Sequence, residues 1–336
     1  MRWHREFNLR QRLVMKVTSF PDIPTFRSSR RNRRDDSWFL GCLLFLLVVS
    51  SKTGAQELEP RRWSHLPTGI NFAAAGYAYT DGNIFLDPAL LVEDAQAEIH
   101  TLALGYVRTF GLLDKSARVD FKLPMSDGYW EGVVDNEFAS TDRQGVGDPK
   151  IRLAMNLYGS PAQTVSEFRP NQSSTVVGAA LEVTIPVGQY YTDRIVNLGS
   201  NRWVYRPHIG VVHTSGKWSY EATVSAWIFG KNDDYQAPGR ELEQDNLYAL
   251  QLHLIHTFRP GLWASLSGAY GTGAAATIDG VKSPNDQGNF LWAASVGLPI
   301  NRRQGIKLAY QRGSTTQATG VDYDRYILAY SLMWGG

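Results

Sequence analysis

Apolar and polar side chains alternate along most of this chain, most clearly from Arg202 to Phe229. Apolar and aromatic residues occupy every second position on both sides of the connection Ser215-Gly216-Lys217. A period of two places them on one face of a β-strand and the intervening polar residues on the other. The short connection containing glycine predicts a turn between two antiparallel strands. Each arm has about a dozen residues, more than a soluble strand usually has and enough for a tilted crossing of a bilayer.

The same alternation returns along the chain from Leu66 to its end. In 116–124 the apolar residues Val119, Phe121 and Leu123 are separated by charged residues. We expect strands at 69–80, 97–110, 116–124, 148–158, 175–187, 202–214, 217–230, 246–258, 262–272, 288–299, 305–313 and 322–334. An even number of strands returns the C-terminus to the side on which the first strand begins.

The lengths of the connections alternate between long and short. Long polar connections are expected at 81–96, 125–147, 188–201, 231–245, 273–287 and 314–321, and short turns at 111–115, 215–217, 259–261 and 300–304. One connection, 159–174, is long where the rule requires a short one. Outer-membrane barrels have short periplasmic turns and long outer loops, whereas a Greek-key sandwich has no reason to sort its loops in this way.

These patterns predict an all-β fold, a transmembrane up-and-down antiparallel β-barrel of about 12 strands. The expected location is the outer membrane of a Gram-negative-type cell, with loops 125–147, 188–201 and 231–245 outside. Outer-membrane lipid would then surround the wall. A secreted soluble β-sandwich that binds a ligand is the alternative fold, and it should have shorter strands.

Aromatic residues give two further signs of a membrane barrel. The last strand alternates apolar residues up to Trp334, which is similar to the signal read by barrel-assembly machinery, although Gly335 and Gly336 follow it. Trp and Tyr also crowd the expected strand ends, as interfacial girdles require, with core packing as the alternative interpretation. The residues assigned to these girdles are Trp63, Trp203, Tyr205, Trp218, Trp263 and Trp334.

The N-terminal region has the pattern of an export signal. Basic residues up to Arg34 precede an apolar run from Trp38 to Ser50, and Thr53-Gly54-Ala55 follows as a small-residue cleavage site. We therefore expect residues 1–55 to be a basic leader and signal peptide, with an uncleaved anchor as the alternative, and 56–336 to be one barrel domain. The only cysteine, Cys42, falls in the signal, so the mature chain would have no disulfide, thiol catalyst or Cys zinc site.

Four stretches of the chain form a recognisable set: Gly145 to Arg152 (GVGDPKIR), Leu181 to Tyr190 (LEVTIPVGQY), the strand Trp218 to Phe229, and the loop with Asn232-Asp233-Asp234. With this set the chain resembles the phenol-degradation meta-pathway (MetA-type) outer-membrane β-barrel transporter family. The likeness extends over roughly 66–334. It implies a transporter or channel for small, often aromatic or apolar, compounds, but it does not imply phenol itself.

Signatures of enzyme chemistry are scarce in this sequence. A nucleophile elbow, a P-loop and a complete GxGxxG are all missing from it. His253 and His256 fall on opposite faces of a strand, as do His208 and His213, so neither pair can share a metal. The acidic run in 233–245 fits a solvated loop better than a calcium site. We therefore expect no enzyme activity, no cofactor and no metal, and the formal charge of +2 argues against nucleic acid as a partner.

Charged and polar residues on the second strand face would line the lumen of a closed barrel. The candidates are Arg118, Asp120, Lys122, Arg152, Glu182, Arg206, His208, Glu221, Gln251, His253, Lys307 and Arg325. Because their charges have mixed signs, we expect many of them to pair in a structural network, with direct solute contact as the alternative. Arg and Lys are in excess among them, so a pore lined by them would weakly favour the passage of anions.

The predicted function is passive passage of a small, aromatic or apolar, solute through the barrel. An outer-membrane lipid hydrolase on a similar barrel is the alternative. It requires a Ser/His pair on one wall, and the sequence alone does not assemble one.

Overall fold

The computed structural model describes residues 58–85, 92–134, 137–168, 174–317 and 320–335. The predicted leader and signal peptide lie outside the described residues. The strands in chain order are β1 (Ile70–Phe85), β2 (Val92–Leu112), β3 (Lys115–Val134), β4 (Glu137–Val146), β5 (Lys150–Tyr158), β6 (Thr175–Thr184), β7 (Val204–Ser215), β8 (Trp218–Phe229), β9 (Leu242–Gln244), β10 (Leu247–Arg259), β11 (Leu262–Gly273), β12 (Ala276–Ile278), β13 (Val281–Lys282), β14 (Gln287–Pro299), β15 (Gln304–Thr315) and β16 (Gly320–Gly335).

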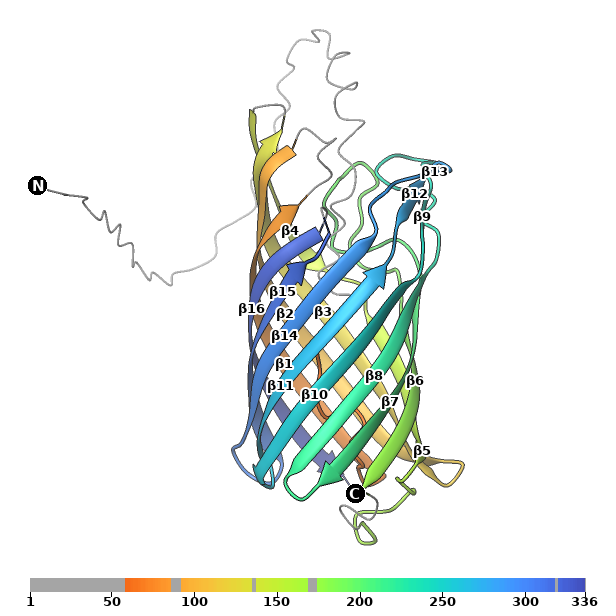
Figure 1. Ribbon diagram of the computed structural model, residues 1–336, viewed down its shortest axis with the longest axis vertical. Coiled ribbons are helices and arrows are strands. Elements are labelled where there is room, and N and C mark those ends of the chain that lie inside the picture. The colour runs from red at the N-terminus through yellow and green to blue at the C-terminus, as the bar shows by residue number, and fades with distance from the viewer. Residues whose placement is uncertain (1–57, 86–91, 135–136, 169–173, 318–319, 336) are drawn as a thin grey trace, which may run out of the picture. The chain divides into compact units, whose positions relative to one another are not determined.

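Antiparallel pairing closes these strands into a barrel (Figure 1). The order is β2-β1-β16-β15-β14-β11-β10-β8-β7-β6-β5-β3, and β2 also pairs with β3. The first and last strands join from Ile70↔Gly335 to Phe85↔Gly320. Because β4 and β5 both pair with β3, they fill one wall position, and the barrel has twelve. The predicted barrel is therefore confirmed, and its closure leaves few unpaired backbone groups in the wall.

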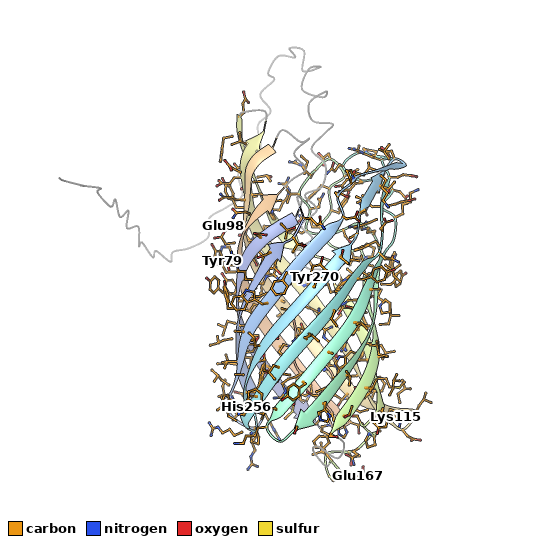
Figure 2. The ribbon with its side chains drawn as sticks, in the orientation of Figure 1. Tyr79, Glu98, Lys115, Glu167, His256 and Tyr270 are labelled. Atoms are coloured by element: carbon orange, nitrogen blue, oxygen red, sulfur yellow. The ribbon has the colours of Figure 1, made fainter. Side chains whose placement is uncertain are left out.

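The two faces of each strand have opposite chemistry. On β8, Val224 is 50% exposed on the outer face, whereas Glu221 and Thr223 are buried inside. Tyr270 on β11 projects from the outer face in the same way (Figure 2). Apolar residues outside and polar residues inside reverse the arrangement of a soluble protein, so the β-sandwich alternative is wrong. No helix among the described residues is long and apolar enough to cross a membrane.

The aromatic girdle is confirmed only in part. Trp203, Trp218 and Trp334 are exposed on the outer face, and His256 lies beside Trp218 with ring centroids 4.4 Å apart, near the short turns (Figure 2). The assignment is wrong for Trp63 and Trp263. Trp63 is buried inside the barrel, and Trp263 faces inward, with the Arg61 guanidinium 5.6 Å from its ring centroid.

Two connections predicted as loops are mainly strand. β1 continues to Phe85 and β2 begins at Val92, while β3 and β4 pair as far as Val134↔Glu137. The Gly and Asp residues in these stretches are typical of turns, and the sequence alone does not show that a partner strand lies beside them. In the structure the two strands of each hairpin stay paired, because pairing satisfies the backbone hydrogen bonds even where no other part of the protein packs on the hairpin. Figure 1 shows the β3–β4 hairpin rising past the neighbouring strands.

Two other long connections build a small cap at the same end. β12 pairs with β9 and β13, and Tyr235, Leu242, Ala276 and Ile278 form its apolar core. The long connection 159–174 also has a role, as far as it is described. Its Gln163 carbonyl accepts from the Thr68 backbone N–H at 2.7 Å, so it fastens the chain just before β1.

The two faces predict opposite effects of one substitution. Val224→Arg places a charge among lipid, and at mid-depth of a barrel wall this costs about 2–4 kcal/mol. Thr101 on β2 faces the interior cavity, so Thr101→Arg should cost much less, and the comparison is measured by urea unfolding in lipid vesicles. Thr223 is unsuitable as the control because its hydroxyl lies buried against Trp63. Equal destabilisation by the two substitutions would contradict the lipid-facing position of Val224.

Candidate functional site

Residues Leu58–Ser64, here the inner segment, cross the interior of the barrel. Leu58 packs against Leu291 of β14 and Tyr323 of β16. At the other end Trp63, which is 1% exposed, packs against Val176 of β6 and Val212 of β7. The segment therefore spans the lumen from one wall to the other, and it obstructs the passage.

Hydrogen bonds to the wall hold the inner segment in place. The Glu221 carboxylate accepts the backbone N–H groups of Arg61 (2.9 Å) and Arg62 (3.2 Å). The Trp63 indole N–H donates to Thr223 Oγ1 at 2.8 Å. Bonds to a carboxylate are stronger than neutral ones, and buried donors are costly to leave unpaired. Glu221 is thus the main polar anchor of the segment.

Two glycines of the wall make room for the Trp63 ring. A Cβ on Gly178 of β6 would lie 2.3 Å from Trp63 Cε3, and one on Gly210 of β7 would lie 2.0 Å from Nε1. Real Cβ atoms do not approach so closely, so only glycine at these two positions allows the ring to lie this near to the wall.

A network of paired charges surrounds the indole ring. Arg152 donates to Asp120 (2.8 Å) and to His208 Nε2 (2.9 Å), and its guanidinium lies 5.2 Å from the Trp63 ring centroid. Arg206 lies 3.6 Å from Glu182 and stacks over Trp227. These contacts form a paired network of the kind that the mixed charges of the predicted lumen residues favoured.

The structure brings together one Ser/His pair that sequence reasoning missed. His253 Nδ1 of β10 lies 2.7 Å from Ser267 Oγ of β11, and Glu221 of β8 is opposite His253 in register. The pair was missed because it depends on the cross-strand register. All three side chains are buried, and Glu221 accepts from the inner segment, so a lipid substrate has no access to this serine. The geometry does not favour the hydrolase alternative.

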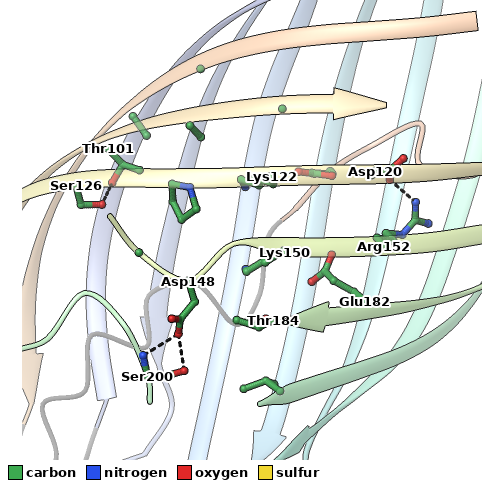
Figure 3. Close-up of a pocket in the computed structure, with 18 of the residues that line it drawn as sticks. Thr101, Asp120, Lys122, Ser126, Asp148, Lys150, Arg152, Glu182, Thr184 and Ser200 are labelled. Carbon is green, nitrogen blue, oxygen red and sulfur yellow. Dashed lines mark hydrogen bonds and ion pairs between the residues drawn. The ribbon is translucent and has the colours of Figure 1, made fainter. Parts of the chain in front are cut away.

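A cavity of about 710 Å³ reaches from the inner segment to the cap. Its lower part is basic, with Lys122 and Lys150 adjacent (Figure 3). Nine described cations line it against four carboxylates, Glu59, Asp120, Asp148 and Glu182. The cations are Arg61, Arg62, Arg118, Lys122, Lys150, Arg152, Arg202, Lys307 and Arg325.

The upper part of the cavity is apolar and aromatic. It is lined by Ile195, Leu198, Val204, Trp227, Phe229, Tyr235, Leu242 and Leu247. Several of these side chains also pack with one another, since Val204, Trp227 and Leu247 belong to one buried cluster with Phe229 against it. The cavity is therefore amphipathic along its length.

Residues 188–201, here the inward loop, form one side of this cavity. Asp148 holds the loop, because its carboxylate accepts from the Gly188 N–H (2.8 Å) and from the N–H (2.7 Å) and hydroxyl (2.6 Å) of Ser200 (Figure 3). Val196 packs against Trp130 of β3. Two of the sequence stretches that carried the resemblance, 145–152 and 181–190, thus meet in this contact.

The predicted lumen residues divide into two groups. Those that line the cavity are Arg118, Asp120, Lys122, Arg152, Glu182, Lys307 and Arg325. Those that are buried, outside the described cavity lining, are Arg206, His208, Glu221, Gln251 and His253. Direct contact of either group with a solute stays a prediction. The sequence did not predict the inner segment, the loop contact of Asp148 or the place of Arg202 in the cavity. The inner segment precedes the first predicted strand. Asp148 and Arg202 begin the predicted strands 148–158 and 202–214, but they lie just before β5 and β7.

The acidic loop residues pair with lysines. Lys231 lies 2.6 Å from Glu241, and Lys282 lies 2.7 Å from Asp245. Within the described ranges no three His, Cys, Asp or Glu residues come together in a way that could hold a metal ion.

A closed antiparallel barrel with an apolar outer face and a polar interior is the architecture of outer-membrane β-barrel proteins. The chain matches the family described as "Putative MetA-pathway of phenol degradation" over residues 72–321, and it belongs to that family. The resemblance seen in the sequence is thereby confirmed.

The chain is similar to known structures to different degrees. The COG4313 outer membrane channel from Pseudomonas putida F1 is 20% identical, with a TM-score of 0.69 over 83% of this chain and 100% of that one. The β domain of the Bordetella autotransporter Brka is more distant, at 10% identity and a TM-score of 0.45 over 79% of this chain and 99% of that one. The first shows a common fold, and the second is too distant to support an argument. No curated protein sequence matches the chain.

Proposed function

We propose that this protein is a passive outer-membrane channel for small solutes with an apolar or aromatic part. The main observation is the amphipathic cavity, with Trp227 and Phe229 in its upper part and Lys122 and Lys150 below them. A solute would enter between the long loops, rest among the aromatic side chains and continue along the basic wall. The most similar structure named above is that of an outer membrane channel, which supports the same function.

Binding and diffusion are sufficient for this function, and the proposal includes no catalytic step. The buried His253–Ser267 pair is then a satisfied hydrogen bond of the wall. Outer-membrane lipid around the apolar face and barrel-assembly machinery during biogenesis remain proposed partners.

Reconstitution in planar bilayers tests the proposal. We expect discrete current steps of low conductance, because the inner segment obstructs the lumen. A folded, correctly inserted sample that never conducts would refute the channel. Salt-resistant recovery in the outer-membrane fraction checks the location, and recovery as a soluble periplasmic protein would exclude it.

The proposal also predicts which end of the barrel is outside. With the signal removed, the mature chain has no cysteine, so Asp233→Cys and Lys217→Cys each introduce a single thiol. Lys217 is chosen because the adjacent Gly216 has a φ of +59°, which other residues rarely adopt. A membrane-impermeant maleimide should label Cys at 233 on intact cells and leave Cys at 217 unlabelled. The opposite pattern would invert the topology.

A further inference from the structure

Arg202 is a buried cation that faces the upper part of the cavity. Its side chain precedes β7, lines the cavity and is only 5% exposed. Nη2 donates to Gln244 Oε1, and the guanidinium lies 4.7 Å from the Phe229 ring centroid. The other terminal nitrogen, Nη1, is buried and has no hydrogen-bond partner. Within the described part of the chain, Arg202 forms no ion pair.

This arrangement differs from that of other arginines in the lumen. Arg152 is paired with Asp120, and Arg206 is close to Glu182. A buried guanidinium nitrogen without a partner is costly, and a carboxylate is the group that best satisfies it. Burial lowers the pKa of Arg202 to about 10, so the side chain is still a cation at neutral pH.

The surroundings of Arg202 indicate what the carboxylate would be attached to. Phe229, Trp227 and Tyr235 line the same part of the cavity, and Leu242 and Leu247 complete its apolar wall. Aromatic side chains bind flat apolar rings through stacked or edge contacts. An aliphatic or strongly hydrated anion would leave these surfaces without a partner.

The cations below Arg202 extend this selectivity along the cavity. Lys150, Lys122 and Lys307 line the lower part, and charged side chains along a pore select the sign of what passes. An anion released from Arg202 thus meets further cations before the inner segment.

We propose that Arg202, with Phe229 and Trp227, forms a binding site for a small aromatic carboxylate inside the barrel. This inference rests on the proposed channel function and specifies its solute class. The carboxylate pairs with the guanidinium of Arg202, which turns slightly so that the enclosed Nη1 meets it, and the ring packs between the aromatic side chains. Nothing is bonded covalently, and the solute leaves unchanged.

Benzoate and its neutral amide analogue, benzamide, test the site because they share a ring and differ in charge. Calorimetric titration of the detergent-solubilised protein should show benzoate binding at least about tenfold tighter than benzamide, which corresponds to the strength of a charge-assisted hydrogen bond. Acetate should bind weakly because it has no ring.

Arg202→Gln should abolish the preference for benzoate over benzamide, while Arg202→Lys should keep part of it. Arg302→Gln removes an exposed cation from a short turn and is the matched control, expected to bind as the wild type does. Heat-modifiable migration in gels verifies that each variant is folded. Equal binding of benzoate and benzamide by the wild type, or an unchanged preference in folded Arg202→Gln, would overturn the site.

Current recordings separate this inference from the channel proposal. Benzoate binding without any conductance would refute the channel and leave the site standing. Conductance with no difference between benzoate and benzamide in calorimetry would leave the channel standing and refute the site.

Discussion

Deleting Leu58–Ser64 should raise the conductance of the reconstituted barrel several-fold. The segment crosses the lumen between Leu291 on one wall and Val212 on another, so current must now pass around it. It belongs to none of the wall strands, and its removal leaves the hydrogen-bonded ladders complete. Glu221 loses its two N–H donors, but water entering the opened lumen can solvate the carboxylate. Planar-bilayer recordings compare the deletion with the full-length protein.

Leu58→Ala is the control for this deletion. It removes apolar contacts at one end of the segment and keeps the Glu221 anchor and Trp63 in place. Its conductance should stay near that of the wild type. If the folded deletion variant conducts no better than the full-length protein, the inner segment is not the obstruction, and the path of ions lies elsewhere.

The wall of the barrel was predictable from the sequence for a physical reason. A strand between lipid and a polar interior must alternate, and this signal is local, so it can be seen in Tyr205, Ile209 and Val224 without knowing their partners. The alternation of long and short connections then indicated an up-and-down order of the strands. The predicted loops 81–96 and 125–147 were wrong as loops, since the pairing of hairpins beyond the wall depends on a partner strand.

The interior was much less predictable. Trp63 has the same signal in the sequence as an interfacial tryptophan, and only the path of the inner segment places it inside. Arg202 and Asp148 stand at the first positions of the predicted strands 202–214 and 148–158, but they lie just before β7 and β5, and alternation does not show which loop or cavity they contact. The His253–Ser267 pair depends on the register of two strands, which alternation alone does not fix. In the sequence, Gly178 and Gly210 cannot be told from ordinary strand residues, because the indole ring that they accommodate comes from a distant part of the chain.

Gly210→Ala should open the lumen without any deletion. The added Cβ would lie 2.0 Å from Trp63 Nε1 and 2.8 Å from Thr223 Oγ1, directly in the hydrogen bond that these two residues make. Overpacking of this kind costs about 1–3 kcal/mol. β7 is held by its pairing with β6 and β8, whereas the inner segment has no ladder, so the segment should move. The fraction of time in open, high-conductance states should rise about tenfold or more.

A control must show that this opening depends on the position of Gly210 and that an added methyl group elsewhere in the wall does not cause it. Gly268→Ala on β11 is the matched control, since the atom nearest to an added Cβ there, the Leu291 carbonyl oxygen, would be 3.9 Å away and leaves room for it. That variant should conduct as the wild type does. Combining Gly210→Ala with the deletion of Leu58–Ser64 should add nothing, because the two changes act on one contact and their effects cannot be additive. A further rise in conductance in the combined variant would mean that Gly210 acts through the wall, and the proposed displacement of Trp63 would be wrong.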